Sequence, residues 1–132
     1  MNPLLRAVLN RILGVEGERT AARFLKRKGF RIITRGFRTK RGEIDLIARD
    51  GRTLVFVEVK TRREGQPAEA VTPEKQQRLT FAALEFLHRH RLLEQPARFD
   101  VIAIVWPHDR QDPAIEHFPN AFEPPGQGQF FR

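Results

Sequence analysis

Two carboxylates and a lysine, Asp45, Glu58 and Lys60, lie in two apolar segments that are joined by the Asp-Gly pair at 50–51. An Asp-Gly pair between apolar runs indicates a tight β-hairpin. A loop centred there would place Asp45 opposite Phe56. Glu58 would then lie one diagonal step away on the same face, about 7–8 Å at the backbone. Strand side chains repeat every two residues, so Lys60 would join the two acids on that face.

This set of residues fits hydrolysis of a phosphodiester assisted by Mg²⁺ or Mn²⁺. Mg²⁺ is typically held by one or two carboxylates together with waters and phosphate oxygens, so we expect Asp45 and Glu58 to be metal ligands. A bound ion lowers the pKa of a coordinated water. Lys60 would orient that water or contact the scissile phosphate. The chain contains no serine, cysteine or tyrosine, which excludes covalent catalysis by those residues.

A purely structural interpretation is open for the same residues. Glu58 and Lys60 could form an ion pair across the sheet, and Asp45 could cap the chain before its strand. The hairpin favours the metal site, because a loop of odd length would send Asp45 to the opposite face. For Asp100 we favour a structural role, in which it pairs with Arg98 or a helix end.

The apolar pattern around these residues predicts a single α/β domain, with a mixed sheet of four or five strands flanked by helices. Strands are expected at about 30–33, 43–49, 53–61, 99–106 and 115–118. The hairpin strands are apolar on both faces, with Ile44 and Leu46 on one face and Ile47 and Phe56 on the other. Such two-sided strands are typical of a sheet that is covered on both sides.

Three helices are predicted. Apolar residues at helical spacing indicate a short amphipathic helix within 1–16, interrupted at Gly14. A second helix should span 17–28, which would put Glu18 in a first turn, where an acid interacts favourably with the helix dipole. A third should span about 72–90, because a threonine followed by proline is a helix start.

The predicted elements divide the chain into three parts. These are the helix at 1–16, the α/β domain at 17–123 and a flexible tail at 124–132, whose two phenylalanines could dock on this molecule or a neighbour. No stretch approaches the roughly 20 apolar residues that cross a bilayer. Together with the absence of cysteine, this favours a cytoplasmic protein without disulfides and without a membrane partner.

The charge of the chain favours a nucleic-acid partner. Its 24 basic and 16 acidic residues give a formal net charge of +8. A genomic bias toward arginine is the alternative explanation. Phe37, among the arginines, could touch a base or pack on the domain edge. The basic residues expected to contact nucleic acid flank the hairpin and are Arg35, Arg38, Lys40, Arg41 and Arg62.

Several motifs resemble one family. The hairpin motifs are Gly42-Glu43-Ile44-Asp45-Leu46-Ile47 and Val55-Phe56-Val57-Glu58-Val59-Lys60-Thr61-Arg62. The others are Gly17-Glu18, Arg98-Phe99-Asp100-Val101 and Asn120-Ala121-Phe122. Together they are similar to the YraN-like proteins, small bacterial relatives of the PD-(D/E)XK nuclease superfamily. The resemblance runs from Gly17 to about Phe122.

The resemblance implies a restriction-endonuclease-like fold that acts on DNA in preference to RNA. It implies an active site of Asp45, Glu58 and Lys60, with Glu18 as an auxiliary acid. It also suggests that Lys75 and Gln76 contact substrate or water, although a solvated helix face would explain them as well.

We therefore expect a nuclease that requires Mg²⁺ or Mn²⁺, selects DNA by its shape, and could act as a homodimer that cuts two strands. The alternative is a nucleic-acid-binding module that keeps the nuclease fold without turnover and acts in repair or processing. A third possibility is a structural protein. In that case Arg35→Ala and Arg38→Ala would alter stability at most.

Overall fold

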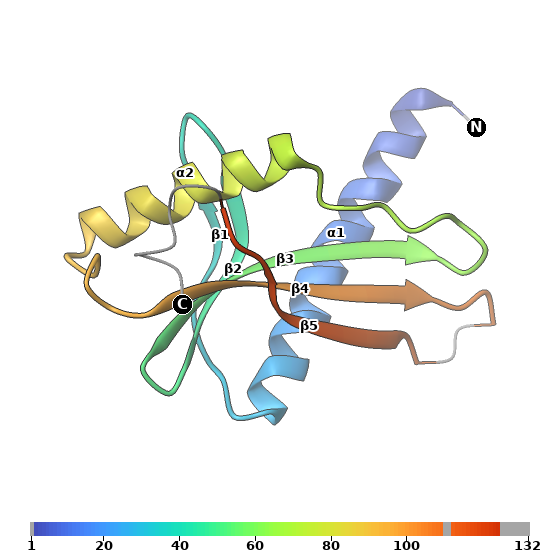
Figure 1. Ribbon diagram of the computed structural model, residues 1–132. Helices are drawn as coiled ribbons and strands as arrows, with labels where there is room; N and C mark the ends of the chain where they lie inside the picture. The colour runs from blue at the N-terminus through green and yellow to red at the C-terminus, as the bar shows by residue number, and fades with distance from the viewer. Residues whose placement is uncertain (1, 110–111, 125–132) are drawn as a thin grey trace.

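In the computed structural model, which describes residues 2–109 and 112–124, a mixed five-stranded sheet lies between two helices (Figure 1). The elements are α1 (Pro3–Arg27), β1 (Arg31–Arg38), β2 (Glu43–Asp50), β3 (Thr53–Arg63), α2 (Pro73–Arg89), β4 (Ala97–Trp106) and β5 (Ala114–Phe122). This confirms the predicted single α/β domain with a mixed sheet flanked by helices. The first and last strands are longer than predicted.

The strands lie in the sheet in their chain order, from β1 to β5. Neighbouring strands are antiparallel except β3 and β4, which are parallel. Parallel neighbours need a crossover, and α2 supplies it between β3 and β4. The middle strand of the sheet is β3, which carries Glu58 and Lys60, and Asp45 lies on its neighbour β2.

The turn between β2 and β3 is displaced from its predicted place. Its two loop residues are 51–52, because Asp50 pairs with Thr53. Gly51 has φ +60°, and a type II′ hairpin turn takes glycine at the first of its two loop positions. An Asp-Gly pair thus marks the hairpin without fixing which residue of the pair enters the loop.

The displaced turn changes the partner of Asp45. Phe56, its predicted partner, pairs instead with Ile47, so the predicted pairing was wrong by two residues. The pairing of β2 with β3 ends at Leu46 and Val57, and Asp45 and Glu58 are the next residues along the two strands. The shift is even, so it moves no side chain of the paired residues 46–50 to the other face.

The N-terminal helix α1 is continuous from Pro3 to Arg27, with the side chain of Asn2 capping its first turn. The predicted interruption at Gly14 was wrong, and the boundary expected after residue 16 lies inside this helix. A glycine costs a helix only about 1 kcal/mol, which the packed residues that follow can offset. The first turn holds no acid, and Glu18 lies far from it, which rules out the helix-dipole explanation for Glu18.

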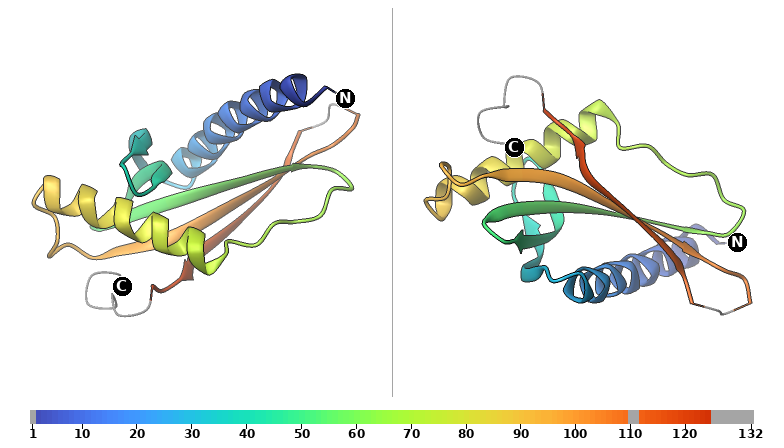
Figure 2. Two further views of the ribbon diagram at one scale, coloured as in Figure 1. Left: turned by 90° about the horizontal axis from the view of Figure 1, so that it is seen from above. Right: turned by 60° about the horizontal axis from the view of Figure 1, so that its bottom comes forward.

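The two helices cover opposite faces of the sheet (Figure 2). The core cluster beneath α1 includes Leu25, Leu46, Val55, Val57 and Ile102. The cluster beneath α2 includes Ile47, Leu54, Phe56, Leu79 and Phe86. Full burial of one such side chain stabilises the fold by about 1.5–3 kcal/mol. Because β3 contributes to both clusters, its first half is covered on both sides, as its pattern predicted.

The remaining predictions concern the ends of the chain and the membrane. Of the tail expected at 124–132, only Pro124 lies within the described residues, so the suggested docking of its phenylalanines lies outside them. No helix in the described ranges is long and apolar enough to cross a membrane.

Candidate active site

Asp45 lies where β2 turns from one layer of the core to the other. Ile44 packs with the cluster beneath α2, whereas Leu46 packs with the cluster beneath α1. In a regular strand these two side chains would share a face, as the sequence pattern predicted. The strand must therefore rotate between them. Asp45 occupies that point, within electrostatic reach of charges on both helices.

Asp45 and Glu58 form a coupled pair of carboxyl groups. The backbone N–H of Val59 donates to Oδ2 of Asp45 at 2.8 Å, and the carboxyl groups of Asp45 and Glu58 lie close enough to share a hydrogen bond when one of them is protonated. Burial raises the pKa of Asp45. Glu58 is only 5% exposed. This burial, and to a smaller extent the negative charge of Asp45, raises the pKa of Glu58 to about 7. A proton or a cation is therefore favoured between them near neutral pH.

Two lysines, one on α2 and one on β3, lie near Glu58. Nζ of Lys75, on α2, lies 3.2 Å from Oε1 of Glu58 and lowers its pKa in part. Nζ of Lys60, on β3, lies 3.7 Å from Oε2 of Glu69. The charge of Lys60 also lowers the pKa of Glu58. Glu58 is thus paired with Lys75, and not with Lys60 as the structural interpretation supposed.

Helix α1 brings Glu18 to this cluster through a close approach at Gly17. A Cβ at Gly17 would collide with Cγ2 of Thr61 on β3, so only glycine lets the helix come this near. Burial raises the pKa of Glu18, and the negative charge of Asp45 raises it further. Glu18, the predicted auxiliary acid, is therefore close enough to Asp45 for their charges to interact.

Glu43 is a fourth acid, which sequence reasoning did not select. Its charge raises the pKa of both Glu18 and Asp45, although Oε2 of Glu43 lies 3.3 Å from Nε of Arg38. Arg35 and Arg38 act on Glu18 in the opposite direction. The spacing of Glu43 and Asp45 along β2 was the signal that could have revealed it.

These residues fit a hard divalent cation. The pair of Asp45 and Glu58 offers only oxygen ligands, and burial destabilises both carboxylates by more than the nearby charge of Lys75 stabilises them. Within the described residues, no three His, Asp or Glu side chains are grouped in a metal-binding arrangement. Water and phosphate oxygens would have to complete the coordination shell, as is usual for Mg²⁺.

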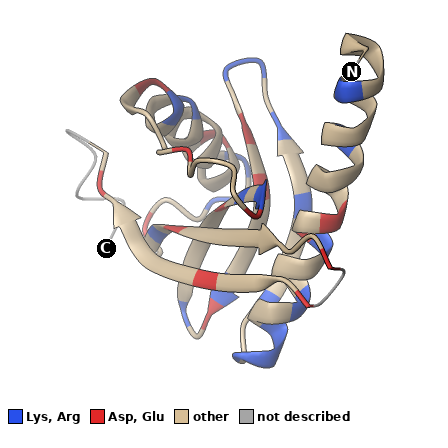
Figure 3. Cartoon of the chain, turned by 90° about the vertical axis from the view of Figure 1, so that its right-hand side faces the viewer, with Lys and Arg blue, Asp and Glu red and all other residues tan. Residues whose placement is uncertain are grey.

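Basic residues gather on the β1–β2 hairpin, whose tip is coloured blue in Figure 3. Lys40 lies at this tip, and the guanidinium of Arg41 lies 5.0 Å from the ring centroid of Phe81 on α2. A Cβ at Gly42 would collide with the backbone oxygen of Arg78, so this glycine permits the contact. The hairpin holds the predicted basic flank beside the helix that supplies Lys75.

Two residues that were predicted to contact nucleic acid, Arg62 and Gln76, form hydrogen bonds with the loop between β3 and α2. Arg62 donates from Nη1 to the backbone oxygen of Gln66. The side-chain amide of Gln76 donates to the backbone oxygen of Val71 at 2.9 Å. Both side chains therefore anchor the loop that runs past Lys60.

Phe37 packs on the domain edge, which was the second of its two predicted roles. Its ring meets that of Phe86 edge-on, at a centroid distance of 5.3 Å, and the guanidinium of Arg89 lies 5.3 Å from the Phe37 ring. The exposed phenylalanine on the sheet is instead Phe118, on β5.

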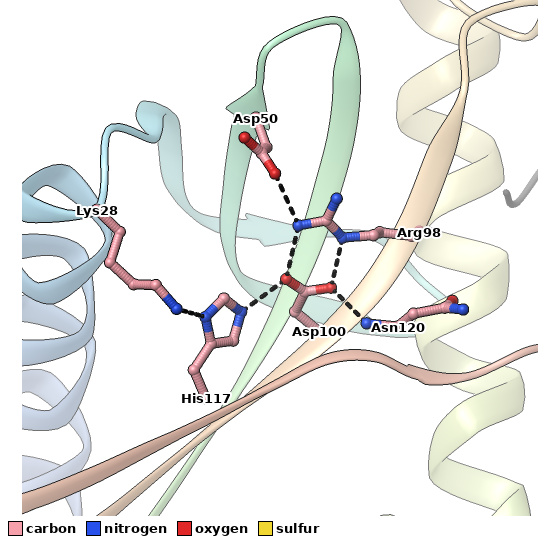
Figure 4. Close-up of polar contacts among 6 residues, drawn as sticks. All are labelled: Lys28, Asp50, Arg98, Asp100, His117 and Asn120. Carbon is pink, nitrogen blue, oxygen red and sulfur yellow. Dashed lines mark hydrogen bonds and ion pairs between the residues drawn. The ribbon is translucent and has the colours of Figure 1, made fainter.

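A second polar cluster, on β4 and β5, surrounds the fully buried Asp100 (Figure 4). Its Oδ1 accepts from Nε of Arg98 and from the backbone N–H of Asn120, both at 2.9 Å. Its Oδ2 lies 2.8 Å from Nε2 of His117 and 3.3 Å from Nη2 of Arg98. Arg98 also reaches Asp50 at 3.1 Å. The predicted pairing of Asp100 with Arg98 is confirmed, and these bonds tie β5 to the sheet.

Comparison with known proteins gives the family. The model of the uncharacterised protein family UPF0102 matches residues 17–104. A UPF0102 protein of Geobacter sulfurreducens is 56% identical over 117 residues, which cover 86% of this chain and 91% of the relative. A UPF0102 protein of Rhodopirellula baltica is 45% identical over 128 residues, which cover 92% of this chain and 77% of the relative. The chain therefore belongs to the uncharacterised family UPF0102, as its resemblance to the YraN-like proteins predicted.

Proposed function

We propose that this protein is a nuclease that hydrolyses phosphodiester bonds with Mg²⁺ or Mn²⁺ and selects DNA by its shape. One observation carries the proposal: Asp45 and Glu58 are joined carboxyls with raised pKa values, next to Lys60 and Lys75. Buried carboxylates without a bound cation are costly, and such perturbed groups cluster at functional sites. Membership of the PD-(D/E)XK superfamily, and the preference for DNA over RNA, rest on the sequence resemblance.

Each residue of the site has a separate role in this proposal. Asp45 and Glu58 would hold the ion, which when bound lowers the pKa of a coordinated water and offsets charge on the phosphate. The side chain of Lys60 is 23% exposed, and its partner Glu69 is 82% exposed. An ion pair in which one partner is this exposed contributes little stability. Lys60 can therefore exchange Glu69 for the scissile phosphate at small cost.

The positive charge around the site supports a nucleic-acid substrate. Lys75 lies in the first turns of α2, where the helix dipole is positive. Arg35 and Arg38 of the β1–β2 hairpin are close enough to Glu18 for their charges to lower its pKa. A phosphate backbone that crosses the site would meet both groups.

One observation favours the alternative of a binding module without turnover. Lys75 already pairs with Glu58 at 3.2 Å, which satisfies a buried carboxylate without a metal. A protein of this kind would bind nucleic acid in a salt-sensitive way and leave it uncut.

Cleavage of labelled linear, flapped and four-way-branched DNA tests the proposal. The unmodified protein, Asp45→Ala and Lys60→Ala would be compared with Mg²⁺, Mn²⁺ or EDTA. Lys26→Ala is a matched control, because it removes an exposed lysine of α1 outside the site. We expect cleavage by the unmodified protein and by Lys26→Ala, and none in EDTA or in the two site variants.

Each contrary result has its own meaning. Cleavage that survives in Asp45→Ala and Lys60→Ala would refute this assignment of the site. Salt-sensitive binding with no cleavage of any DNA would refute the nuclease and leave the binding module. The absence of both binding and cleavage would leave only a structural role.

A further inference from the structure

Beyond the N-terminus of α2, no helix covers the α2 side of the sheet along the carboxyl ends of β3 and β4, and only the loop between β3 and α2 runs beside it (Figure 1). Val101 and Ala103, which face this side on β4, are partly exposed. Ile102 and Ile104, which alternate with them and face α1, are fully buried. Only one face of this half of the sheet is therefore covered by a helix.

Strand pairing arranges the side chains of this open face in rows that start at the candidate active site. The two rows run from β3 through β4 to β5 and consist of Glu58, Val101 and Phe118, and of Lys60, Ala103 and Glu116. Neighbouring strands lie about 4.8 Å apart, so the backbones of Glu58 and Phe118 are about 10 Å apart along one row. The small side chains of β4 leave the space between them open.

Phe118 stands between two hollows on this face. The smaller, of about 480 Å³, extends toward Gln76 and Pro119. The larger, of about 930 Å³, includes Lys60 and Arg62 and continues around the end of the sheet toward α1. Both hollows are lined by Phe118, which is 43% exposed. Its ring is thus open to a flat ligand from the side of the candidate site.

The environment of Phe118 differs from that of its neighbour on β5. Phe122 stacks on Phe99 at a centroid distance of 4.8 Å. Among the described residues, no aromatic ring and no cation packs on the ring of Phe118. Single exposed apolar residues are common on protein surfaces, so it is the position of Phe118 between the two hollows, in one row with Glu58, that makes its ring a candidate contact.

We propose that Phe118 stacks against the base of an unpaired nucleotide whose phosphate lies at Lys60. The charges on the open face set this direction, because Lys60 and Arg62 attract a phosphate, which would displace the exposed Glu69 from Lys60, whereas Glu116, one row from Phe118, repels one. The base, and not the backbone, therefore lies over the ring. Every base presents a flat face, so the contact selects unpaired strands without reading sequence.

This inference rests on the proposed function and specifies its substrate class. A base inside an intact duplex is stacked on its neighbours and cannot lie on Phe118. A flap, a splayed branch or a single strand offers a free base next to the scissile phosphate. The open face would thus make the nuclease selective for DNA with unpaired nucleotides at the cleavage point.

Binding of the full chain to DNA in EDTA tests the inference apart from cleavage. The probes are a single-stranded oligonucleotide that carries one fluorescent 2-aminopurine base and a blunt duplex of the same sequence. Phe118→Ala removes the ring and Phe118→Trp keeps a stacking surface. Ile33→Ala is the matched control, because Ile33 is also a large exposed apolar residue but lies on β1, at the opposite edge of the sheet.

We expect Phe118→Ala to weaken single-strand binding about tenfold, within the range typical of one base–aromatic stack, and to relieve the quenching of 2-aminopurine. Duplex binding should stay the same, and Phe118→Trp and Ile33→Ala should behave like the unmodified protein. Unchanged single-strand binding by Phe118→Ala, equal weakening for both probes, or no binding of either probe would overturn the inference. A strand-selective loss in a protein that never cleaves DNA would support the stack and refute the nuclease alone.

Discussion

Replacement of Glu58 by glutamine should change how the stability of the protein depends on pH. Burial and the charge of Asp45 raise the pKa of Glu58 from its usual 4.5 to about 7. Between these values the folded protein holds a proton that the unfolded chain has released. The free energy of unfolding therefore falls as the pH rises through this range.

The size of this effect follows from the shift in pKa. A pKa raised from 4.5 to about 7 corresponds to about 3 kcal/mol of stability lost between those pH values. Glutamine has a similar shape and does not ionise, so Glu58→Gln should lack this loss. Relative to the unmodified protein, the variant should gain about 3 kcal/mol on passing from below pH 4.5 to above pH 7, a large part of the usual stability of a domain.

Urea unfolding at a series of pH values measures this difference directly. Glu94→Gln is the matched control, because Glu94 is an exposed glutamate and its replacement should leave the pH dependence unchanged. If the stabilities of Glu58→Gln and the unmodified protein run parallel across the whole pH range, Glu58 does not have a raised pKa, and the electrostatic description of the site is wrong.

Gly17→Ala should lower the free energy of unfolding by about 1–3 kcal/mol in urea, because its methyl group collides with β3. Gly14→Ala, whose methyl group meets nothing, should raise it by up to about 1 kcal/mol; equal effects would contradict the close approach of α1. Lys75→Gln removes a charge that lowers the pKa of Glu58, so the pH-dependent fall in stability should move to higher pH, and an unmoved profile would refute the ion pair. Asp100→Asn should cost about 2 kcal/mol in thermal unfolding, since it removes the buried anion of Arg98 and leaves only the partly exposed Asp50 as its partner, and a neutral result would show that this cluster does not hold β5.

Local signals predicted the elements that carry the site. Threonine followed by proline located the start of α2, where Thr72 accepts from the backbone N–H of Lys75. The Asp-Gly pair located the hairpin of β2 and β3. Its exact loop could not be predicted, because glycine suits either loop position of a tight turn, and the observed turn uses Gly51 as the first.

Contacts between distant parts of the chain could not be predicted from these patterns. Periodicity assumes a regular strand, so the rotation of β2 at Asp45 was invisible. A break at Gly14 was expected from helix propensity alone, and the structure carries the helix through it. The pairing of Lys75 with Glu58 joins two elements whose distance the sequence does not encode. For the same reason, the exposure of Phe118 became apparent only once α2 was placed on the sheet.

Calorimetric titration of Mn²⁺, above the pKa of Glu58, would determine whether Asp45 and Glu58 hold one ion together. The titration would compare the unmodified protein with Asp45→Asn, Glu58→Gln and the control Glu94→Gln. We predict binding by the unmodified protein and the control, and loss of that binding in each of the two site variants, since each removes one of the two carboxylates. Equal Mn²⁺ binding by all four proteins would contradict a metal site at Asp45 and Glu58.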